Sequence, residues 1–467
     1  MMEPISVGEI LTATGGTLIR GRYDELIYGV STDSRKLKPG DMFIPLIGER
    51  FNGHDFILQA VKNGAKAVLT QEPERQLPDD VQVIQVDNTL TALQELAGYY
   101  RNKFDVPVIA VTGSTGKTTT KDMIHHVLRV RFNALKTEGN LNNEIGLPLT
   151  LLNMERQHEM VVVEMGMSGF GEIERMAKIA RPVNAVITNI GISHIEKLGS
   201  RENILRAKME IFCDFPPDGM AILNGDDDML WKIRDGLPYN IYYFGTREGL
   251  DFQAVDIQTT AEGGLKFRLL CGEGDYPFEL PVLGRHNVYN SLAAIATGRL
   301  YDMDFQEIRE ALHSFKAAGM RLNVVTTPDG ITVIDDVYNA SPDSMKAALA
   351  VLNDMKAKRK IAVLGDMLEL GMYSEAGHRE VGRAVADNRI DLLITKGRDS
   401  SWIGQEAESM GMQASRIFHC TSNKDVIDLL STIVQTGDTI LVKGSRGMKM
   451  EDVVSYLLKG GHESWNH

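Results

Sequence analysis

The residue types best suited to chemistry lie close together in the segment VIAVTGSTGKTTTKDMIHHVL, residues 108–128. An apolar run typical of a buried strand leads into a glycine-rich turn, then through Lys117 and Thr118 into a segment with amphipathic helical spacing. Backbone N–H groups at such a turn and at a helix start bind phosphate. A lysine there reaches the β- and γ-phosphates of a nucleotide, and the hydroxyl that follows ligates Mg²⁺. We therefore predict a nucleotide phosphate site made of Gly113, Ser114, Thr115, Gly116, Lys117, Thr118 and Thr119.

This loop departs from the G-x-x-x-x-G-K-[ST] pattern, because Val111 stands at the first glycine position and Gly113 follows two residues later. An ordinary strand–turn–helix, in which Gly113 and Gly116 only supply turn geometry, is the simpler alternative. The phosphate site is favoured because the strand, the turn, the Lys-Thr pair and the helix occur in the required order.

Three residues further along the chain could take part in a metal site. Glu164 ends the apolar run MVVVE, and an acid at the carboxyl end of a strand beside the phosphate strand suits Mg²⁺ or a metal-bound water. His194 follows the run NAVITNIG, where a lone histidine is more often structural. Lys208 lies in a segment with helical spacing and would usually be a solvated residue. An ammonium group has no lone pair, so Lys208 becomes a metal ligand only as a carbamate, which spacing alone does not suggest.

Two asparagines three residues apart, Asn287 and Asn290, begin the helical segment HNVYNSLAAIATG. Side-chain amides can pair with the donor and acceptor edge of adenine. Helix capping by Asn287 is the alternative, and it leaves Asn290 without a role.

The elements that must position these residues are short apolar runs alternating with helical patterns. Runs rich in Val, Ile and Leu that end in Gly, Asp or Asn are typical of buried parallel strands covered on both faces by helices. They are residues 65–70, 106–113, 159–166, 184–191, 220–226, 360–366, 391–397 and 439–445. The fold class predicted is therefore α/β, with more than one sheet.

Length and pattern together predict three domains. We expect a small mixed unit over 1–98, a larger α/β unit over 99–315, and a third α/β unit over 316–467. Residues 91–104 have helical spacing and would connect the first two units. Alternation and a Gly-Gly pair predict a β-hairpin within 251–272.

Composition excludes several classes of protein. The 50 Lys+Arg against 63 Asp+Glu give a net charge of −13, which argues against broad nucleic-acid binding but not against one anionic ligand in a local basic pocket. The three scattered cysteines suit a reducing compartment. We read no signal peptide and no apolar run long enough for a membrane span. We expect a soluble, cytoplasmic protein, with a monomer as the default state.

The order of these motifs resembles the Mur ligases, ATP-dependent amide-forming enzymes of peptidoglycan synthesis. The resemblance rests on TGSTGKT (112–118), VVEMG (162–166), NIGISH (189–194), RAKMEIF (206–212) and RHNVYN (285–290), and it covers essentially the whole chain. It implies a central P-loop-type mononucleotide-binding parallel sheet and a Rossmann-like C-terminal domain that closes on ATP. Four further stretches, at 30–57, 137–148, 335–349 and 442–454, are similar to the branch of the family that adds D-alanyl-D-alanine.

The resemblance implies roles for individual residues. Thr118, Glu164, His194 and a carbamylated Lys208 would hold Mg²⁺, with two ions expected. Lys117, Lys208, His194 and Arg321 would form the catalytic set, with Arg321 reaching the γ-phosphate from the third domain. Asn287 would contact adenine, and Asp336, or its neighbour Asp335, the ribose. Ser31, Asp33, Ser34 and Arg35 would hold the uridine diphosphate, and Asn140, Asn142 and Asn143 would lie near the muramoyl peptide.

The implied substrates are ATP, UDP-N-acetylmuramoyl-tripeptide and D-alanyl-D-alanine, joined through an acyl phosphate. Two departures from the family pattern stand out: Met320 replaces the usual glycine before Arg321, and Ser341 replaces a usual asparagine. One alternative is another amide ligase of the superfamily, adding diaminopimelate or lysine, or extending folate with glutamate. The absence of a D-N-P-R motif and the presence of the D-S-R segment disfavour these. A second alternative is a nucleotide-gated protein that binds the precursor without turnover.

Overall fold

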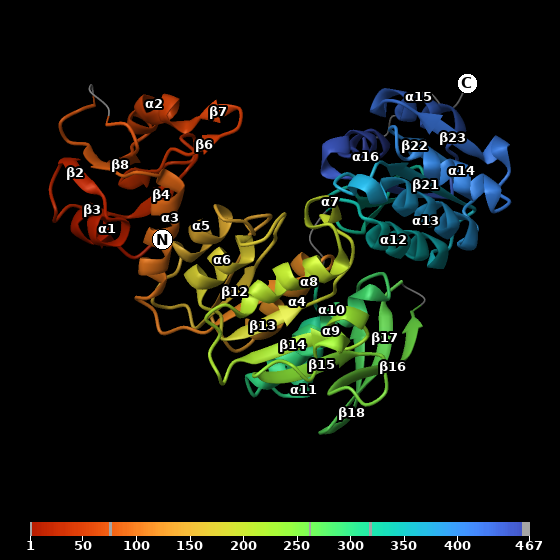
Figure 1. The fold of residues 1–467 in the computed structure, drawn as a ribbon. Helices are drawn as coiled ribbons and strands as arrows, with labels where there is room; N and C mark the ends of the chain where they lie inside the picture. The colour runs from red at the N-terminus through yellow and green to blue at the C-terminus, as the bar shows by residue number, and fades with distance from the viewer. Residues whose placement is uncertain (1, 74–76, 261–262, 317–319, 460–467) are drawn as a thin grey trace.

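The computed structural model describes residues 2–73, 77–260, 263–316 and 320–459. Three large sheets follow one another along the chain, and each forms the centre of a unit. We call these the first unit (sheet within 17–85), the middle unit (sheet within 108–280) and the third unit (sheet within 323–443). In Figure 1 the first unit (red) and the third unit (blue) both adjoin the middle unit, near its two ends.

The first unit has a five-stranded sheet in the order β2-β9-β8-β5-β4, parallel except for the edge strand β2. Its strands are β2 (Thr17–Arg20), β4 (Gly29–Ser31), β5 (Asp41–Phe43), β8 (Ala67–Thr70) and β9 (Gln82–Gln85). Two short antiparallel pairs flank it, β1 (Ile5–Ser6) with β3 (Leu26–Ile27) and β6 (Ile47–Gly48) with β7 (Phe51–Asn52). Its helices are α1 (Val7–Thr14), η1 (Gly53–Phe56), α2 (Ile57–Lys62) and α3 (Thr89–Arg101).

Helix α3 ties the first unit to the middle one, as the helical spacing of 91–104 predicts. The helix begins after Asn88, whose side chain accepts from the Thr91 N–H. Tyr100 is fully buried, and its hydroxyl donates to the Met154 carbonyl at 2.7 Å and accepts from the Glu3 N–H at 2.8 Å. Burial raises the pKa of Tyr100 to about 12, so the hydroxyl stays protonated.

We expect Tyr100→Phe to destabilise the protein by about 1–2 kcal/mol, because it leaves a buried carbonyl and N–H without a partner. The midpoint of urea-induced unfolding measures this loss. Tyr99→Phe is the matched control, since Tyr99 lies beside Tyr100 on the same helix and is only half-buried. Equal midpoints for the two variants would contradict the account of how the units are joined.

The middle unit has a nine-stranded sheet in the order β11-β12-β10-β13-β14-β15-β16-β17-β18, parallel from β11 to β16. Its strands are β10 (Val108–Thr112), β11 (Ala134–Lys136), β12 (Met160–Glu164), β13 (Asn184–Ile187), β14 (Met220–Asn224), β15 (Asn240–Gly245), β16 (Phe252–Thr259), β17 (Leu265–Cys271) and β18 (Gly274–Leu280). The last three pair antiparallel, and β16 and β17 are the two strands of the hairpin predicted within 251–272.

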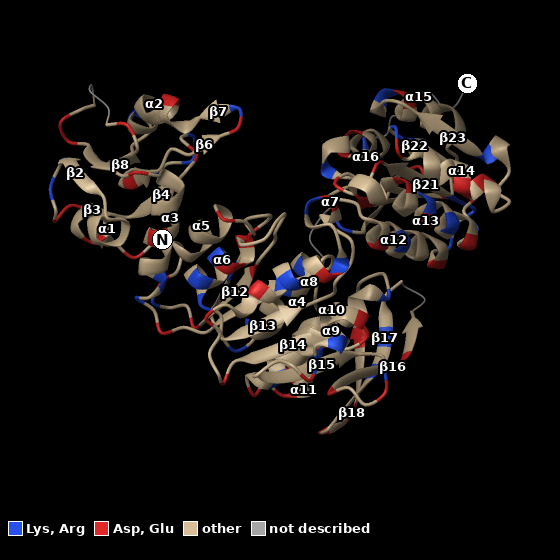
Figure 2. Cartoon of the chain, viewed as in Figure 1, with Lys and Arg blue, Asp and Glu red and all other residues tan. Residues whose placement is uncertain are grey.

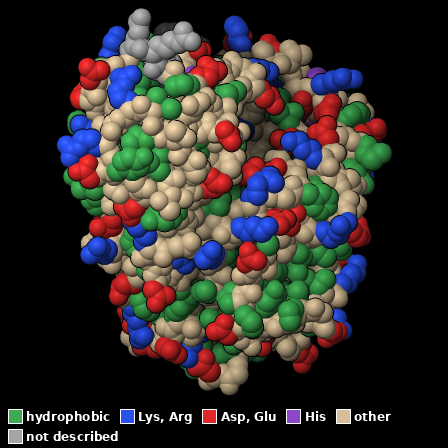
Figure 3. Space-filling model, turned by 60° about the vertical axis from the view of Figure 1, so that its left-hand side comes forward, with side chains coloured by type: hydrophobic (Ala, Val, Ile, Leu, Met, Phe, Trp, Pro, Cys, Tyr) green, Lys and Arg blue, Asp and Glu red, His purple; other side chains and the backbone are tan. Residues whose placement is uncertain are grey.

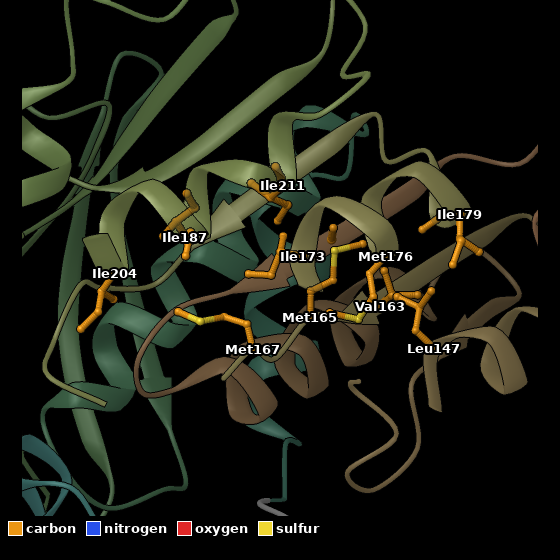
Figure 4. Packing of buried hydrophobic residues seen from close by; sticks show 14 of the residues in the cluster. Leu147, Val163, Met165, Met167, Ile173, Met176, Ile179, Ile187, Ile204 and Ile211 are labelled. Carbon is orange, nitrogen blue, oxygen red and sulfur yellow. The ribbon is translucent and has the colours of Figure 1, made fainter. Parts of the chain in front are cut away.

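Helices cover both faces of this sheet, as the unbroken apolar strands predict. Alternate residues of β10 face opposite sides: Ala110 packs toward the side of α5, α6 and α8, whereas Ile109 packs toward α4, α10 and α11. Figure 4 shows the first of these cores, where Ile173 and Met176 of α6 lie over Val163 of β12. The helices are α4 (Lys117–Leu128), α5 (Gly146–Leu151), α6 (Glu172–Ala180), α7 (Ile195–Leu198), α8 (Arg201–Met209), η2 (Glu210–Phe212), α9 (Asp228–Lys232), α10 (His286–Leu300) and α11 (Phe305–His313).

The third unit has a six-stranded sheet in the order β19-β20-β24-β21-β22-β23, parallel except for the edge strand β19. Helices α12, α13 and α14 pack on one face and α15 and α16 on the other. The strands are β19 (Asn323–Thr326), β20 (Thr332–Asp336), β21 (Arg359–Gly365), β22 (Leu392–Lys396), β23 (Ile417–Cys420) and β24 (Asp438–Lys443). The helices are α12 (Pro342–Asp354), η3 (Gly371–Tyr373), α13 (Ser374–Asp387), α14 (Ser401–Ser409), η4 (Ala414–Arg416), α15 (Asn423–Ile433), η5 (Arg446–Met448) and α16 (Glu451–Leu458).

Charged side chains of both signs are spread over all three units (Figure 2). The space-filling view shows the same mixture on one face of the molecule, which is hollowed in its upper half (Figure 3). None of the helices in the described parts of the chain is long and apolar enough to cross a membrane. The α/β fold class predicted from the sequence is confirmed.

Candidate nucleotide and metal site

A cavity of about 1630 Å³ lies between the middle and third units. The phosphate loop and the start of α10 line it from the middle unit, and the segments around Arg321 and Asp336 line it from the third. The predicted residues that line it are Ser114, Thr115, Gly116, Lys117, Thr118, Thr119, Asn142, Asn143, Glu164, His194, Asn287, Arg321 and Asp336. Most of the predicted nucleotide and metal residues therefore face one space.

The phosphate loop follows β10 and ends where α4 begins at Lys117. Two glycines are required by close approach: a Cβ on Gly113 would lie 1.8 Å from the Thr188 hydroxyl oxygen, and one on Gly116 would lie 2.8 Å from an Asn290 side-chain oxygen. Both have positive φ, 149° and 79°, which favours glycine. Gly116 lines the cavity, whereas Gly113 does not.

The segment after β13 holds this loop in shape. Asn189 accepts from the Ser114 N–H through its carbonyl and from the Thr115 N–H through its side chain, both at 3.0 Å. The Ser114 hydroxyl oxygen accepts from the Gly191 N–H at 2.9 Å. Lys117 folds back over the loop, and its ammonium donates to the Gly113 carbonyl at 2.8 Å. Burial lowers the pKa of Lys117, and the Glu164 carboxylate partly opposes that shift.

Glu164 ends β12 and is almost fully buried, with 1% of its surface exposed. One carboxylate oxygen accepts from the Asn142 side-chain amide at 2.7 Å, and the other has no hydrogen-bond partner among the described residues. A buried carboxylate oxygen without a partner is costly unless a cation or donor meets it. Thr118 lies nearby at the start of α4, with its hydroxyl side chain facing the same cavity. The donor set present therefore fits a hard cation such as Mg²⁺, which prefers oxygen ligands.

His194 precedes α7 in a left-handed backbone conformation, with φ 60°. Its Nδ1 lies 2.5 Å from a carboxylate oxygen of Glu369, which belongs to the third unit. Burial lowers the pKa of His194, Glu369 opposes the shift, and the charges of Lys117 and Lys208 add to it. Glu369 could not be predicted from the sequence, because the contact joins segments far apart in the chain.

Lys208 lies on α8 and is buried, with 2% of its surface exposed, so it is not the solvated residue that helical spacing suggests. It does not line the cavity, but it lies near enough to Lys117 for that charge to act on it. In the described part of the chain, no carboxylate is within ion-pair distance of its ammonium group. Burial first, and then Lys117, lowers the pKa of Lys208 well below its ordinary value. The neutral amine is therefore easier to reach there than on an exposed lysine.

Asn287 and Asn290 lie one turn apart at the start of α10 and form a chain of hydrogen bonds. The Asn290 amide donates to the Asn287 side-chain oxygen at 2.8 Å, and the Thr120 hydroxyl donates to Asn290 at 3.0 Å. The Asn287 amide donates to the Leu283 carbonyl at 2.6 Å. Asn287 therefore does not cap the helix; the pair joins α10 to α4 beside the cavity.

The third unit contributes Arg321 and Asp336. The positive charge of Arg321 is near enough to act on the pKa of Lys117. Asp336 ends β20 and lines the cavity, whereas Asp335, which points to the opposite side of the strand, does not. Met320 before Arg321 has φ 60°, which explains why glycine suits that position.

The four predicted uridine residues lie in the first unit and are not part of this cavity. The Ser31 hydroxyl oxygen accepts from the Asp33 N–H, and Asn63 donates to the Ser34 carbonyl. The Arg35 guanidinium, whose side chain is 83% exposed, binds both carboxylate oxygens of Asp33. This ion pair lowers the pKa of Asp33 to about 2. Arg35 is therefore oriented at the surface and open to a further anion.

The loop between β11 and α5 carries the predicted asparagines. Asn142 reaches Glu164, and the Asn143 side chain accepts from the Gly146 N–H at 2.8 Å, while both line the cavity. Asn140 does not line it. The fully buried Thr137 anchors this loop, because its hydroxyl accepts from the Glu164 N–H and its carbonyl accepts from Lys121.

Sequence reasoning missed His286, Tyr338 and Lys443, all of which line the cavity. Burial lowers the pKa of His286 to about 4, so this side chain is neutral between Asn287 and the third unit. The one available signal was for Lys443: a lysine that ends an otherwise apolar strand rarely lies inside a protein without a partner.

Family models match the chain in three places. "Mur ligase family, catalytic domain" matches residues 26–101, "Mur ligase middle domain" residues 111–298, and "Mur ligase, glutamate ligase domain" residues 320–446. The UDP-N-acetylmuramoyl-tripeptide–D-alanyl-D-alanine ligase of Bacillus subtilis is 42% identical over 456 residues, covering 97% of this chain and 98% of the relative. The enzyme of the same name from Escherichia coli is 37% identical, covering 94% and 95%.

Solved structures agree with the sequence relatives. MurF from Acinetobacter baumannii superposes with a TM-score of 0.89 at 33% identity, covering 98% of this chain and 99% of that one. MurF ligase from Thermotoga maritima in complex with ADP has a TM-score of 0.80 at 30% identity, covering 92% and 97%. The chain belongs to the Mur ligase family, and its fold is the three-domain architecture of that family.

Proposed function

We infer that this chain is an ATP-dependent, ADP-forming ligase that joins D-alanyl-D-alanine to UDP-N-acetylmuramoyl-tripeptide. The observation that carries this conclusion is the shared cavity, in which a phosphate loop and an unpartnered Glu164 oxygen face Arg321 of another unit. Its relatives over nearly the full length carry this activity in their names. The product is the pentapeptide precursor of peptidoglycan, made in the cytoplasm, and we propose that the enzyme acts there as a monomer.

We propose a division of labour among the three domains. Residues 1–98 bind the uridine nucleotide through Ser31, Asp33, Ser34 and Arg35. Residues 99–315 bind the phosphates of ATP, with Asn287 at adenine and with Asn140, Asn142 and Asn143 near the muramoyl peptide. Residues 316–467 supply Arg321 to the γ-phosphate and Asp336 to the ribose, and receive the dipeptide.

The reaction must bring together two anions, the tripeptide carboxylate and the ATP triphosphate. At about 4 Å, two like unit charges repel by about 4 kcal/mol at an effective dielectric of about 20. Lys117 and Arg321 approach the triphosphate from two units and offset this repulsion. A carboxylate oxygen then attacks the γ-phosphorus, ADP leaves, and the dipeptide amine displaces phosphate from the acyl phosphate.

Thr118, Glu164 and His194 would hold Mg²⁺, with two ions expected, since the unpartnered Glu164 oxygen fits a cation. Bound there, Mg²⁺ would neutralise charge on the transferring phosphoryl group. The Nδ1 atom of His194 faces Glu369, so Nε2 is the ring nitrogen that would ligate the ion. The described residues contain no cluster of three His, Cys, Asp or Glu side chains that could hold a metal by itself, so a further anionic ligand is needed.

We propose that a carbamate on Lys208 supplies this ligand. The lowered pKa favours the neutral amine, which attacks carbon dioxide to form an N–C bond and loses a proton to solvent. The carbamate places an anion near Lys117, which would attract it, whereas the ammonium form of Lys208 would be repelled.

Arg35→Ala should weaken binding of the uridine nucleotide by about 10- to 100-fold, because one charge-assisted hydrogen bond to a phosphate is lost. Titration calorimetry with UDP-N-acetylmuramoyl-tripeptide measures this change. Affinity for ATP should stay the same, since Arg35 lies outside the cavity.

Arg22→Ala is the matched control for Arg35→Ala, because Arg22 forms a similar exposed ion pair with Asp24 in the same unit. Equal uridine-nucleotide affinity in the Arg35 and Arg22 variants would remove Arg35 from the substrate site.

Phosphate release with ATP and Mg²⁺ tests the proposed function. Release should require both UDP-N-acetylmuramoyl-tripeptide and D-alanyl-D-alanine, and the product should carry the mass of the pentapeptide. Release with diaminopimelate, lysine or glutamate in place of the dipeptide would favour another ligase of the superfamily. Binding of both ligands without release would favour a non-catalytic precursor-binding protein.

A further inference from the structure

Lys443 is the last residue of β24, and it is buried with 2% of its surface exposed. Strand β24 lies between β20 and β21, so Lys443 lies directly beside Asp336 at the carboxyl ends of two parallel strands. Ligands of open α/β sheets bind at this edge. The roles proposed above leave Lys443 unused, although it lines the cavity.

The ammonium group of Lys443 is fully engaged by its own unit. It donates to an Asp336 carboxylate oxygen at 2.6 Å, to the Asn339 carbonyl at 3.0 Å and to the Asp336 carbonyl at 3.5 Å. An ammonium has three donors, so none remains for a substrate phosphate in this arrangement. These contacts fix the Asp336 carboxylate and the backbone of the segment 336–339.

This segment in turn holds Arg321. The second Asp336 carboxylate oxygen accepts from the Leu322 N–H at 3.3 Å, next to Arg321. The Tyr338 ring lies under the guanidinium, 4.1 Å from ring centre to guanidinium carbon. Met320 and Leu322, on either side of Arg321, have φ of 60° and 48°. Residues other than glycine rarely adopt this backbone conformation, so surrounding contacts must maintain it.

We propose that Lys443 and Tyr338 are positioning residues that set the direction of the Arg321 guanidinium toward the phosphate loop. Lys443 fixes the backbone of the segment 336–339 and the Leu322 N–H through Asp336, and Tyr338 fixes the guanidinium plane by a cation–π contact. A long arginine held in one direction loses less freedom when the γ-phosphate arrives. This inference rests on the proposed role of Arg321.

The Tyr338 contact is tested by steady-state kinetics on Tyr338→Leu and Tyr338→Phe. The leucine variant should lower kcat by about tenfold, as expected for a lost cation–π contact, while KM for the uridine substrate stays constant. The phenylalanine variant keeps the ring face and should recover most of the rate. Equal rates for the two variants would overturn the proposal.

The Lys443 contact is tested by Lys443→Met, with Lys396→Met as the control. Lys396 ends the nearby strand β22 of the same sheet, donates to the Met448 carbonyl and does not line the cavity. Lys443→Met should lower kcat by up to about 100-fold, since small misplacements of catalytic groups have effects of this size. Lys396→Met should leave kcat unchanged.

Double variants with Arg321→Ala separate positioning from general damage. If Tyr338 and Lys443 act through Arg321, their substitution should change kcat by less than about twofold once Arg321 is gone. Additive losses would overturn the proposal. If Lys443→Met does not fold, the Tyr338 series decides alone. If Arg321→Ala itself keeps the full rate, the proposed role of Arg321 is wrong, and the proposed roles of Tyr338 and Lys443 are wrong with it.

Discussion

Replacing Lys117 by alanine should lower the rate of ADP formation by at least about 1000-fold, which is the scale on which cationic groups stabilise a transferring phosphoryl group. Lys117 lies at the start of α4 with its ammonium 2.8 Å from the Gly113 carbonyl. It thus rests on the loop that would surround the phosphates of ATP. Burial lowers its pKa, so its charge is held at a cost that an arriving triphosphate would offset.

The Lys117→Ala variant should still bind UDP-N-acetylmuramoyl-tripeptide, because the proposed uridine residues lie in another unit. Stopped-flow phosphate release measures the rate, and calorimetry measures the retained binding. Lys197→Ala is the matched control, since Lys197 is exposed on α7 near the site but does not line the cavity. If Lys117→Ala forms ADP as fast as the Lys197→Ala control, the phosphate loop has no part in the reaction and the assignment is wrong.

The second large effect is expected at Lys208. Lys208→Ala should lower turnover by about 100- to 1000-fold, because the proposed carbamate ligand of the metal is lost. A small carboxylate such as acetate should restore part of the rate, since the alanine leaves space where the carbamate would be and acetate supplies equivalent oxygens. No buried ion pair is broken by this substitution in the described structure, so the protein should fold.

Two controls sharpen the Lys208 test. Lys117→Ala should not respond to acetate, because Lys117 must be a cation for its proposed role. The unaltered enzyme should lose activity when dissolved carbon dioxide is removed and regain it when bicarbonate returns. A Lys208→Ala variant with full activity, or one that acetate does not affect, would contradict the carbamate.

Much of the fold could be predicted because its signals are local. The strand β10, the turn and α4 follow one another within residues 108–128, and each has its own pattern of apolar residues and glycines. The strands of the middle and third units are buried on both faces, so their apolar runs are unbroken. The Lys-Thr pair that predicts the phosphate loop lies in the same short segment.

The contacts that complete the site could not be predicted, because they join residues distant in the sequence. Asn142 meets Glu164 across the loop before α5, and His194 meets Glu369 of another unit. Lys443 reaches Asp336 only because β24 inserts between β20 and β21. The sequence does not distinguish Asp335 from Asp336 as the residue that would contact the ribose. Side chains alternate along β20, and of these two acids Asp336 lines the cavity.

The burial of Lys208 could not be predicted from the sequence either, for a different reason. Helical spacing predicts a solvated side chain, but Lys208 lies on the buried side of α8. Its pKa follows from this burial and from Lys117, and neither is visible in the order of residues. The family resemblance implied a modified lysine, and the burial gives a physical reason why the neutral amine is easier to reach there than on an exposed lysine.

The central claim is that ATP activates the tripeptide carboxylate in the cavity between the middle and third units. The direct test uses UDP-N-acetylmuramoyl-tripeptide with both terminal carboxylate oxygens replaced by oxygen-18, together with ATP, Mg²⁺ and D-alanyl-D-alanine. Attack on the γ-phosphorus transfers one labelled oxygen to phosphate and leaves the other in the new amide carbonyl. Mass spectrometry should find one oxygen-18 atom in each phosphate released. Unlabelled phosphate released alongside the pentapeptide would contradict the account.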